Sequence, residues 1–362
     1  MDGPRAIQMN ELDQVISFLN ENLRPDQSWT IDQEYPEVFN SKNTHNIQVV
    51  TDNENILSHA AIKFFLIKTP FGLFKTAAIG SVVTDPNHRN KGLSQSLLEK
   101  CIASAKEQQA DFAILWTDLF NFYRKLGFEL AGTEMSIIVD KNLLTTPSKL
   151  KFMDTLKIAP ESILNLYSKH TVGSIRTVQE LNRYLKIPNT KLYTAWDNNQ
   201  LLAYAVEGKG ADLNGYIHEW GGGVSHLVEL FDYIYKSQKK PITIISPDNC
   251  SNLIRTLKDH HLTVNTGYLG MIKILNTKNL FSKIVRHARS LGENKFIFLE
   301  QDNEYILGVK SNLFKTNSEQ DVIQLIFGPH SDSLLNKFDP ETKKIIQKVL
   351  PLPMWFWGWD SV

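Results

Sequence analysis

Residues 84–94 read TDPNHRNKGLS and lie between a strand-like apolar run and an amphipathic helix predicted at about 93–108. A turn that leads into a helix leaves free backbone N–H groups at the positive end of the helix dipole, and this arrangement favours an anion. Gly92 lets a diphosphate approach the backbone closely, the small Ser94 preserves that approach, and Arg89 can contact phosphates. The stretch is therefore predicted to hold a pyrophosphate.

A second motif, FYRKLGF at 122–128, follows at short distance along the chain. Apolar residues at 112–116 predict a short buried strand, and 118–125 predicts a helix that stops at Gly127. Before the first motif, a helix beginning at Leu12 and strands on both sides of a Pro70-Phe71-Gly72 turn are expected. The first part of the chain thus reads as an α/β unit.

The two motifs in this order resemble the GNAT superfamily of acetyl-CoA-dependent transferases. The family pattern is a strand, R-x-x-G followed by a small residue, a helix, a strand and F-Y-x-x-L-G-F; Ser94 departs from it, because the family usually has Gly or Ala there. The resemblance implies that main-chain groups pair with the pantetheine arm at Val82, Val83 and Thr84, and that N–H groups reach the phosphates at Lys91, Gly92, Leu93 and Ser94. For the side chain of Lys91, a solvated turn charge is an equal alternative.

The resemblance also implies a direct attack of an amine on the thioester, with Tyr123 as the general acid that protonates the departing thiolate. The competing interpretation is that Gly92 merely caps a helix and Tyr123 packs in a core. The general base is open. Many GNAT enzymes carry a glutamate on the strand before the pyrophosphate loop, but residues 76–83 contain no carboxylate. Water is one alternative, and Asp118, which also suits a helix N-cap, is another.

The remainder of the chain first repeats the order of elements seen in the first unit and then follows a different pattern. Helices and strands from about Pro147 to Lys258 repeat the earlier order, and this repetition suggests a structural duplication. The R-x-x-G signature is not repeated. From Leu269 onward the pattern is that of a small α+β domain. We expect a mixed α/β chain with a GNAT domain at 1–142, a degenerate GNAT-like domain at 143–268, and a domain resembling sterol carrier protein at 269–362.

This order resembles the enhanced-intracellular-survival class of acetyltransferases. In that class the C-terminal carboxylate lies in the first domain's active site and serves as the base, which points here to Val362, with Asp360 as a second carboxylate. The tail contains four large aromatic residues between Trp355 and Trp359, which must pack somewhere. The alternative is that they only seal a seam between domains.

The acceptor side is predicted from the resemblance in the first helix and the loop after it. This loop carries carboxylates and aromatic rings that would suit a cationic amine: Asp26, Trp29, Asp32, Glu34 and Tyr35. A solvated surface loop is the other interpretation. In the second unit, His218 and Glu219 precede three glycines, and a structural turn with one of the pair buried is favoured over a metal site.

Composition limits the partners. The 39 basic and 39 acidic residues cancel, and no basic run suggests binding to nucleic acid or an anionic membrane. The N-terminus lacks the apolar stretch of a signal peptide, and only Cys101 and Cys250 could form a disulfide, so a reducing cytoplasm is expected. A homo-oligomer is compatible with the sequence.

The sequence therefore predicts an enzyme that moves an acetyl group from acetyl-CoA, as co-substrate and without metal, to a small-molecule or peptide amine. A non-catalytic protein that senses acyl-CoA or binds a lipid is the alternative, and a scaffold that binds no CoA is a third. The acceptor and the acyl length are left open.

Overall fold

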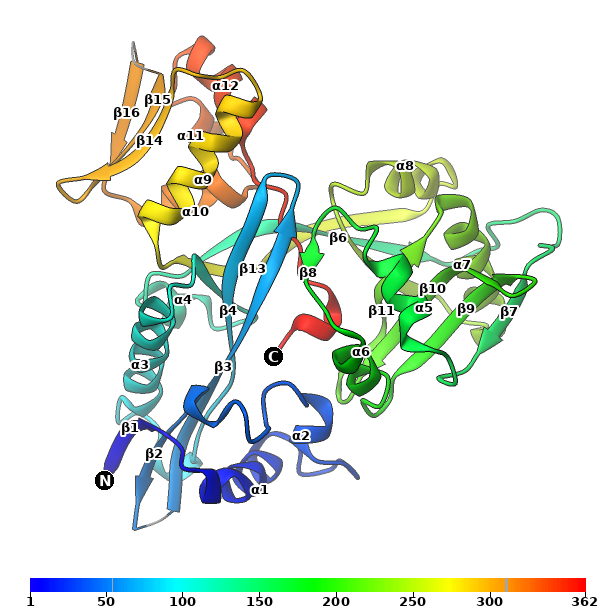
Figure 1. Ribbon diagram of the computed structural model, residues 1–362, viewed down its shortest axis with the longest axis horizontal. Helices are drawn as coiled ribbons and strands as arrows, with labels where there is room; N and C mark the ends of the chain where they lie inside the picture. The colour runs from blue at the N-terminus through cyan, green and yellow to red at the C-terminus, as the bar shows by residue number, and fades with distance from the viewer. Residues whose placement is uncertain (54, 310–311) are drawn as a thin grey trace.

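The structure is a computed structural model that describes residues 1–53, 55–309 and 312–362. Over these residues the chain forms one 13-stranded sheet and one 3-stranded sheet. Figure 1 shows two α/β units side by side around the large sheet, with a smaller domain next to the first unit.

The first unit begins as its sequence pattern predicts, with an amphipathic helix and a long hairpin. Its elements are β1 (Asp2–Ala6), α1 (Leu12–Leu23), α2 (Ile31–Glu34), β2 (Ile47–Asp52), β3 (Asn55–Thr69), β4 (Gly72–Thr84), α3 (Leu93–Glu107), β5 (Phe112–Leu115), α4 (Phe120–Arg124) and β6 (Glu129–Val139). Helix α3 buries Leu97, Leu98 and Cys101 against one face of the sheet. Helices α1 and α2 cover the other face. The unit is therefore a sheet with helices on both sides.

The second unit repeats this order. Its elements are β7 (Lys151–Asp154), α5 (Pro160–Tyr167), β8 (Gly173–Ser174), α6 (Val178–Tyr184), β9 (Lys191–Asp197), β10 (Gln200–Lys209), β11 (Asp212–Gly222), α7 (Val224–Gln238), β12 (Ile242–Pro247), α8 (Ser251–Asp259) and β13 (Thr263–Ile274). Strand β11 leads through a glycine turn into α7, as β4 leads into α3. The expected structural duplication is therefore visible in the order of elements.

The two units exchange strands. Strand β13, from the second unit, inserts between β5 and β6 of the first, and β6 in turn pairs with β12 of the second. The sheet is consequently continuous across both units. The boundary expected at 268/269 falls inside β13, because the change of pattern at Leu269 occurs within a strand whose second half completes the first unit's sheet.

The C-terminal part is a small α+β domain, as predicted. It contains α9 (Thr277–Ser290), β14 (Phe296–Gln301), β15 (Glu304–Val309), β16 (Asn312–Thr316), α10 (Glu319–Phe327), α11 (Asp332–Leu335) and α12 (Pro340–Val349). Helix α9 stacks Phe281 on Phe298 of the antiparallel sheet, with ring centroids 4.0 Å apart. In the described part of the chain, no helix is both long and apolar enough to cross a bilayer.

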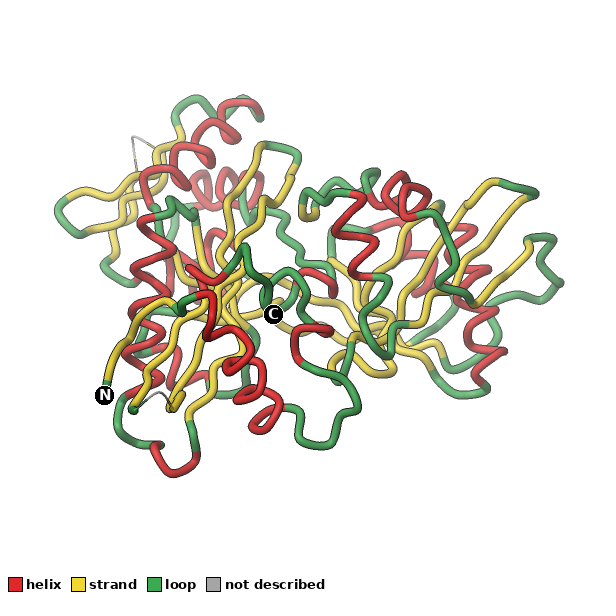
Figure 2. The backbone as a smooth tube through the Cα atoms, turned by 60° about the horizontal axis from the view of Figure 1, so that its bottom comes forward, coloured by secondary structure: helices red, strands yellow, loops and turns green. Residues whose placement is uncertain are grey.

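After α12 the chain leaves this domain and ends between the two units. We call residues 351–362 the tail. Trp355, Trp357 and Trp359 are at most 1% exposed, and Phe356 packs edge-on against Phe65 of β3. In Figures 1 and 2 the C-terminus lies at the centre of the molecule, between the units. The aromatic residues of the tail are thus buried, as their composition required.

A buried ion network joins the tail to the second unit. Arg176, between β8 and α6, pairs with Glu219 of β11 at 2.7 Å and with Asp360 of the tail at 3.0 Å. All three side chains are at most 2% exposed. Burial alone would raise the pKa of Asp360, but the nearby charges of Arg176 and Lys63 lower it, so this carboxylate stays ionised.

Replacing Arg176 by methionine should destabilise the protein strongly, because two buried carboxylates would lose their cation. Removing one partner of a buried ion network costs about 3–5 kcal/mol. We expect Arg176→Met to lower the free energy of unfolding by this amount, measured by urea denaturation. It should also expose the tail tryptophans, which would shift their fluorescence emission to the red. Arg183→Met is the matched control. Its pair with Glu37 has a 46% exposed arginine side chain, and its loss should cost less than about 1 kcal/mol. Equal effects of the two changes would contradict a stabilising role for the buried network.

Candidate active site

The central feature of the first unit is the place where two parallel strands part. Strand β4 pairs with β5 only at 76–78, although β4 itself continues to Thr84. A bulge at Ser81, whose φ is 52°, shifts the register of β4 against β3. The ring of His59 holds this bulge through Nδ1, 2.7 Å from the carbonyl oxygen of Ser81. Bulges re-aim the backbone, and here the change leaves main-chain groups of β4 facing a cleft.

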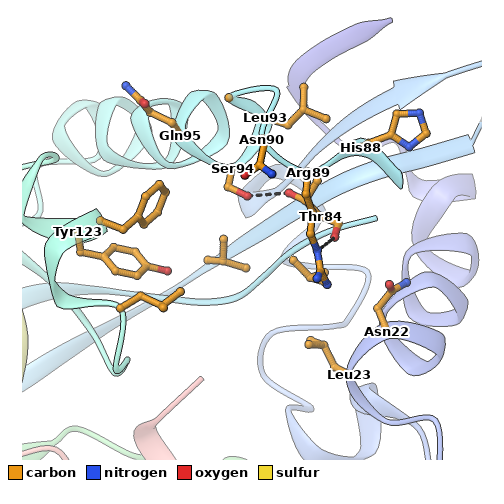
Figure 3. Close-up of a pocket in the computed structure, with 15 residues that line it drawn as sticks. Asn22, Leu23, Thr84, His88, Arg89, Asn90, Leu93, Ser94, Gln95 and Tyr123 are labelled. Carbon is orange, nitrogen blue, oxygen red and sulfur yellow. Dashed lines mark hydrogen bonds between the residues drawn. The ribbon is translucent and has the colours of Figure 1, made fainter. Parts of the chain in front are cut away.

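The loop after β4 has the geometry of an anion cradle. Gly92, the N-cap of α3, has φ 78° and makes no side-chain cap. A Cβ added there would meet nothing within 4 Å, so open space lies above the helix start. The Thr84 and Ser94 hydroxyls are 2.6 Å apart, and Arg89 Nε donates to Thr84 O at 3.4 Å (Figure 3). Fifteen-residue α3 thus presents uncapped N–H groups to this space.

The cleft has a volume of about 500 Å³ and brings together residues of both predicted motifs. Of the predicted cofactor residues, it is lined by Val82, Val83, Thr84, Arg89, Gly92, Leu93 and Ser94. Lys91 is exposed and lies outside this lining. Seven further residues line the cleft that the sequence pattern did not assign to it: Asn22, Leu23, His88, Asn90, Gln95, Leu119 and Phe122. Asn22 and Leu23 come from the last turn of α1 and join the cleft only through the fold.

Tyr123 lines the same cleft from α4. Its ring packs edge-on against Phe122 and Phe128, and the side chain is 7% exposed. Figure 3 shows its hydroxyl directed toward the space between α4 and the parted strand. Burial raises the pKa of Tyr123, so the phenol remains a proton donor across the neutral range.

The C-terminus lies against the strand that lacks a carboxylate. A Cβ built on Gly80 of β4 would lie 2.6 Å from the carbonyl carbon and oxygen of Val362. The Val362 side chain packs on the apolar cluster beneath α1 and α2. Val362 therefore occupies the space that a side chain at position 80 would take. A glycine in β4 is the local signal for this approach, and the sequence analysis did not use it.

The loop predicted to face the acceptor contains residues open to solvent and one buried carboxylate. Asp26 is exposed, and Trp29 and Asp32 are half-buried. Glu34 is fully buried; its carboxylate accepts from Arg24 at 2.7 Å, from Trp29, and from the Ala211 N–H at 2.8 Å. Its partners leave no free carboxylate for a substrate.

The other carboxylates considered for catalysis are placed elsewhere. Asp360 is engaged with Arg176 and with the Ser174 hydroxyl at 2.7 Å, so it does not serve as a free base. Asp118 is exposed and is not the N-cap of α4; Leu119 holds that position, and its N–H donates to Thr117.

His218 and Glu219 of the second unit are both fully buried, whereas one of the pair was expected to be. His218 Nε2 lies 3.0 Å from Gly208 O, and Glu219 pairs with Arg176. The described residues contain no group of three or more His, Cys, Asp or Glu that could hold a metal ion.

Comparison with known proteins agrees with this geometry. Residues 4–131 match the family model described as an acetyltransferase (GNAT) domain. No curated protein matches the sequence. The match covers the first unit, which carries the parted strand and the glycine loop described above.

Solved structures match almost the entire chain. They include a GCN5-related N-acetyltransferase from Anabaena variabilis (15% identity, 99% of both chains, TM-score 0.68). They also include a probable N-acyltransferase of unknown function from Enterococcus faecalis (14% identity, 98% of both chains, TM-score 0.64). Eis1 from Mycobacterium abscessus has 10% identity over 99% of both chains and a TM-score of 0.64. The chain thus shares its overall fold, over nearly its full length, with these three proteins.

Gly80→Ala should displace the C-terminus, because its methyl group would overlap Val362. For an acetyl-CoA-dependent transferase in which Val362 takes part in the reaction, turnover should fall about tenfold or more, as a displacement on the order of 1 Å at a reacting group allows, with an unchanged dissociation constant for acetyl-CoA. The measurement is steady-state kinetics beside isothermal titration. Gly267→Ala in β13 is the control, since a Cβ there would meet nothing within 4 Å. Full activity of the Gly80 variant would show that the approach of Val362 has no role in turnover.

Proposed function

We propose that this protein is an N-acetyltransferase that moves an acetyl group from acetyl-CoA to a primary amine by direct attack. The observation that carries the proposal is the cleft itself, in which a parted strand, an uncapped helix start and a buried tyrosine line one space. Pantetheine would pair with the main chain of Val82, Val83 and Thr84. The pyrophosphate would lie on the N–H groups of Gly92, Leu93 and Ser94, beside Arg89.

In this mechanism Tyr123 is the general acid. The amine nitrogen forms a bond to the thioester carbon, the C–S bond breaks, and the phenol gives its proton to the departing sulfur. The raised pKa supports the assignment, because it keeps the proton on the phenol until the thiolate forms.

The base in this mechanism is the terminal carboxylate of Val362. It would attract a substrate ammonium and accept the proton that the nitrogen loses. Its place against Gly80 supports this role, since other GNAT enzymes carry a glutamate on the same strand. Asp26, Trp29 and Asp32 are proposed to face the acceptor, with Glu34 supporting their loop from beneath through Arg24 and Trp29.

A thiol-release assay tests the function. Acetyl-CoA is presented with polyamines, lysine peptides and aminoglycosides, and release of free CoA with any of them supports the enzyme. Tight binding of acetyl-CoA without release would favour the alternative of a non-catalytic acyl-CoA or lipid sensor, and absence of binding would favour a scaffold.

Tyr123→Phe should lower turnover about 10²–10⁴-fold, the range of a general acid, and leave acetyl-CoA binding nearly unchanged. Because burial raises the pKa of Tyr123 above its ordinary value, the ratio of wild-type to variant turnover should be constant from about pH 7 to pH 9. Rate profiles of both proteins with one amine check this. A ratio that falls within that interval would assign the proton to another group, and unchanged turnover would remove Tyr123 from the mechanism.

Deleting Ser361 and Val362 should give a folded protein that binds acetyl-CoA but has lost turnover. Adding Gly80→Glu to the deletion places a carboxylate on β4 in the vacated space, and part of the activity should return. The same substitution in the full chain is the control: there the new side chain meets Val362, and activity should fall. An active deletion variant would exclude the terminal carboxylate as the base.

A further inference from the structure

The last backbone carbonyls before the C-terminus are all held by two buried lysines. Lys63 Nζ of β3 donates to Trp359 O at 3.2 Å and to Asp360 O at 3.3 Å. Lys209 Nζ of β10 donates to Gly358 O at 3.2 Å and to Ser361 O at 2.6 Å. Of these four consecutive carbonyls, Lys63 of the first unit binds the inner two and Lys209 of the second unit binds the outer two.

The surroundings of Lys209 match an ammonium group. Its third acceptor is the Ser361 hydroxyl at 2.9 Å, so three N–H donors meet three oxygens, and the charge lies 4.6 Å from the centre of the Tyr35 ring. The residue is 1% exposed, and burial lowers the pKa of its amine to about 7. The direct acceptors are neutral oxygens. Burial and the charge of Lys63 lower the pKa of Lys209, and the carboxylates of Asp212, Asp360 and Glu34 offset this only in part.

Stability alone does not explain a lysine at this place. Burying an ammonium group is unfavourable unless it is fully paired, and an apolar side chain of similar length fills such a space at lower cost. The ammonium group does, however, form hydrogen bonds that fix the position of Ser361, the residue before the terminus. Ser361 has both its carbonyl and its hydroxyl on Lys209, and Val362 follows directly.

We propose that Lys209 is a positioning residue for catalysis: the second unit, which lacks the pyrophosphate signature, holds the tail so that the terminal carboxylate stays against Gly80 in the first unit's site. Lys63 performs the matching task from the first unit. This inference rests on the proposed role of Val362 as the base. It gives the degenerate unit a part in the reaction without a second coenzyme site.

The test is Lys209→Met in the full chain, compared with Lys209→Arg. The methionine variant should lose turnover about 10–100-fold through a misplaced carboxylate, with the KM for acetyl-CoA unchanged, and arginine, which keeps the charge and the donors, should restore part of it. Lys191→Met is the control in the same sheet, since Lys191 is half-exposed, pairs with Glu207, and should leave the rate unchanged. Intrinsic tryptophan fluorescence and acetyl-CoA titration show whether each variant is folded.

A double-mutant cycle with the deletion of Ser361 and Val362 separates the two proposals. If Lys209 acts through the terminus, Lys209→Met should cause no further loss in the deletion background whose activity Gly80→Glu has partly restored. An inactive deletion variant beside a fully active Lys209→Met overturns the positioning role and leaves the base in place. An active deletion variant overturns the base itself.

If Lys209→Met does not fold, Ser361→Ala gives a second reading. It removes one acceptor of the lysine and leaves the carbonyl, so a smaller loss of turnover, on the order of a few-fold, is expected with normal acetyl-CoA binding. Unchanged turnover in this variant, together with a Lys209→Arg protein as inactive as the deletion, would overturn the inference.

Discussion

Three buried cations need partners, and the last residues of the chain supply them. Lys63, Arg176 and Lys209 come from both units and are each at most 7% exposed. Charged groups without partners are among the most unfavourable features of a protein interior. The Asp360 carboxylate and the tail carbonyls meet this requirement. The tail and the two units therefore depend on one another, and a seam that would otherwise be open to water is closed.

This arrangement links assembly to chemistry. The strand exchange of β6 and β13 makes the units one sheet and fixes the seam between them. The buried tryptophans fill that seam, and Gly80 leaves room for the chain to end against β4. An end of the chain, which is usually mobile, is thereby ordered beside the cleft. Under the proposed mechanism this order supplies the carboxylate that β4 lacks.

The loop at 84–94 depends, by contrast, on residues that are close together in the chain. Gly92 adopts a positive φ, α3 begins directly after it, and Ser94 and Thr84 meet through their hydroxyls. These features involve residues close together in the chain. The sequence motif predicted the glycine turn with the correct strand before it and helix after it. Tyr123 could be assigned to the same cleft from a short motif, because only strand β5 separates its helix α4 from α3 along the chain. Asn22 and Leu23, which close the cleft from α1, could not be.

Three features could be predicted from the sequence alone: the alternation of strands and helices, the glycine turn at 84–94, and the duplication of units. These features depend on periodicity and on neighbouring residues. The tertiary structure alone decided that β13 completes the first sheet, that Glu34 and Asp360 are engaged in buried pairs, and that Lys209 grips the tail. Those contacts join residues far apart in the chain; Lys63 and Trp359 are separated by 296 positions. The sequence around a charged residue does not show which distant residue will pair with it and make its burial favourable. Only the folded chain shows that partner.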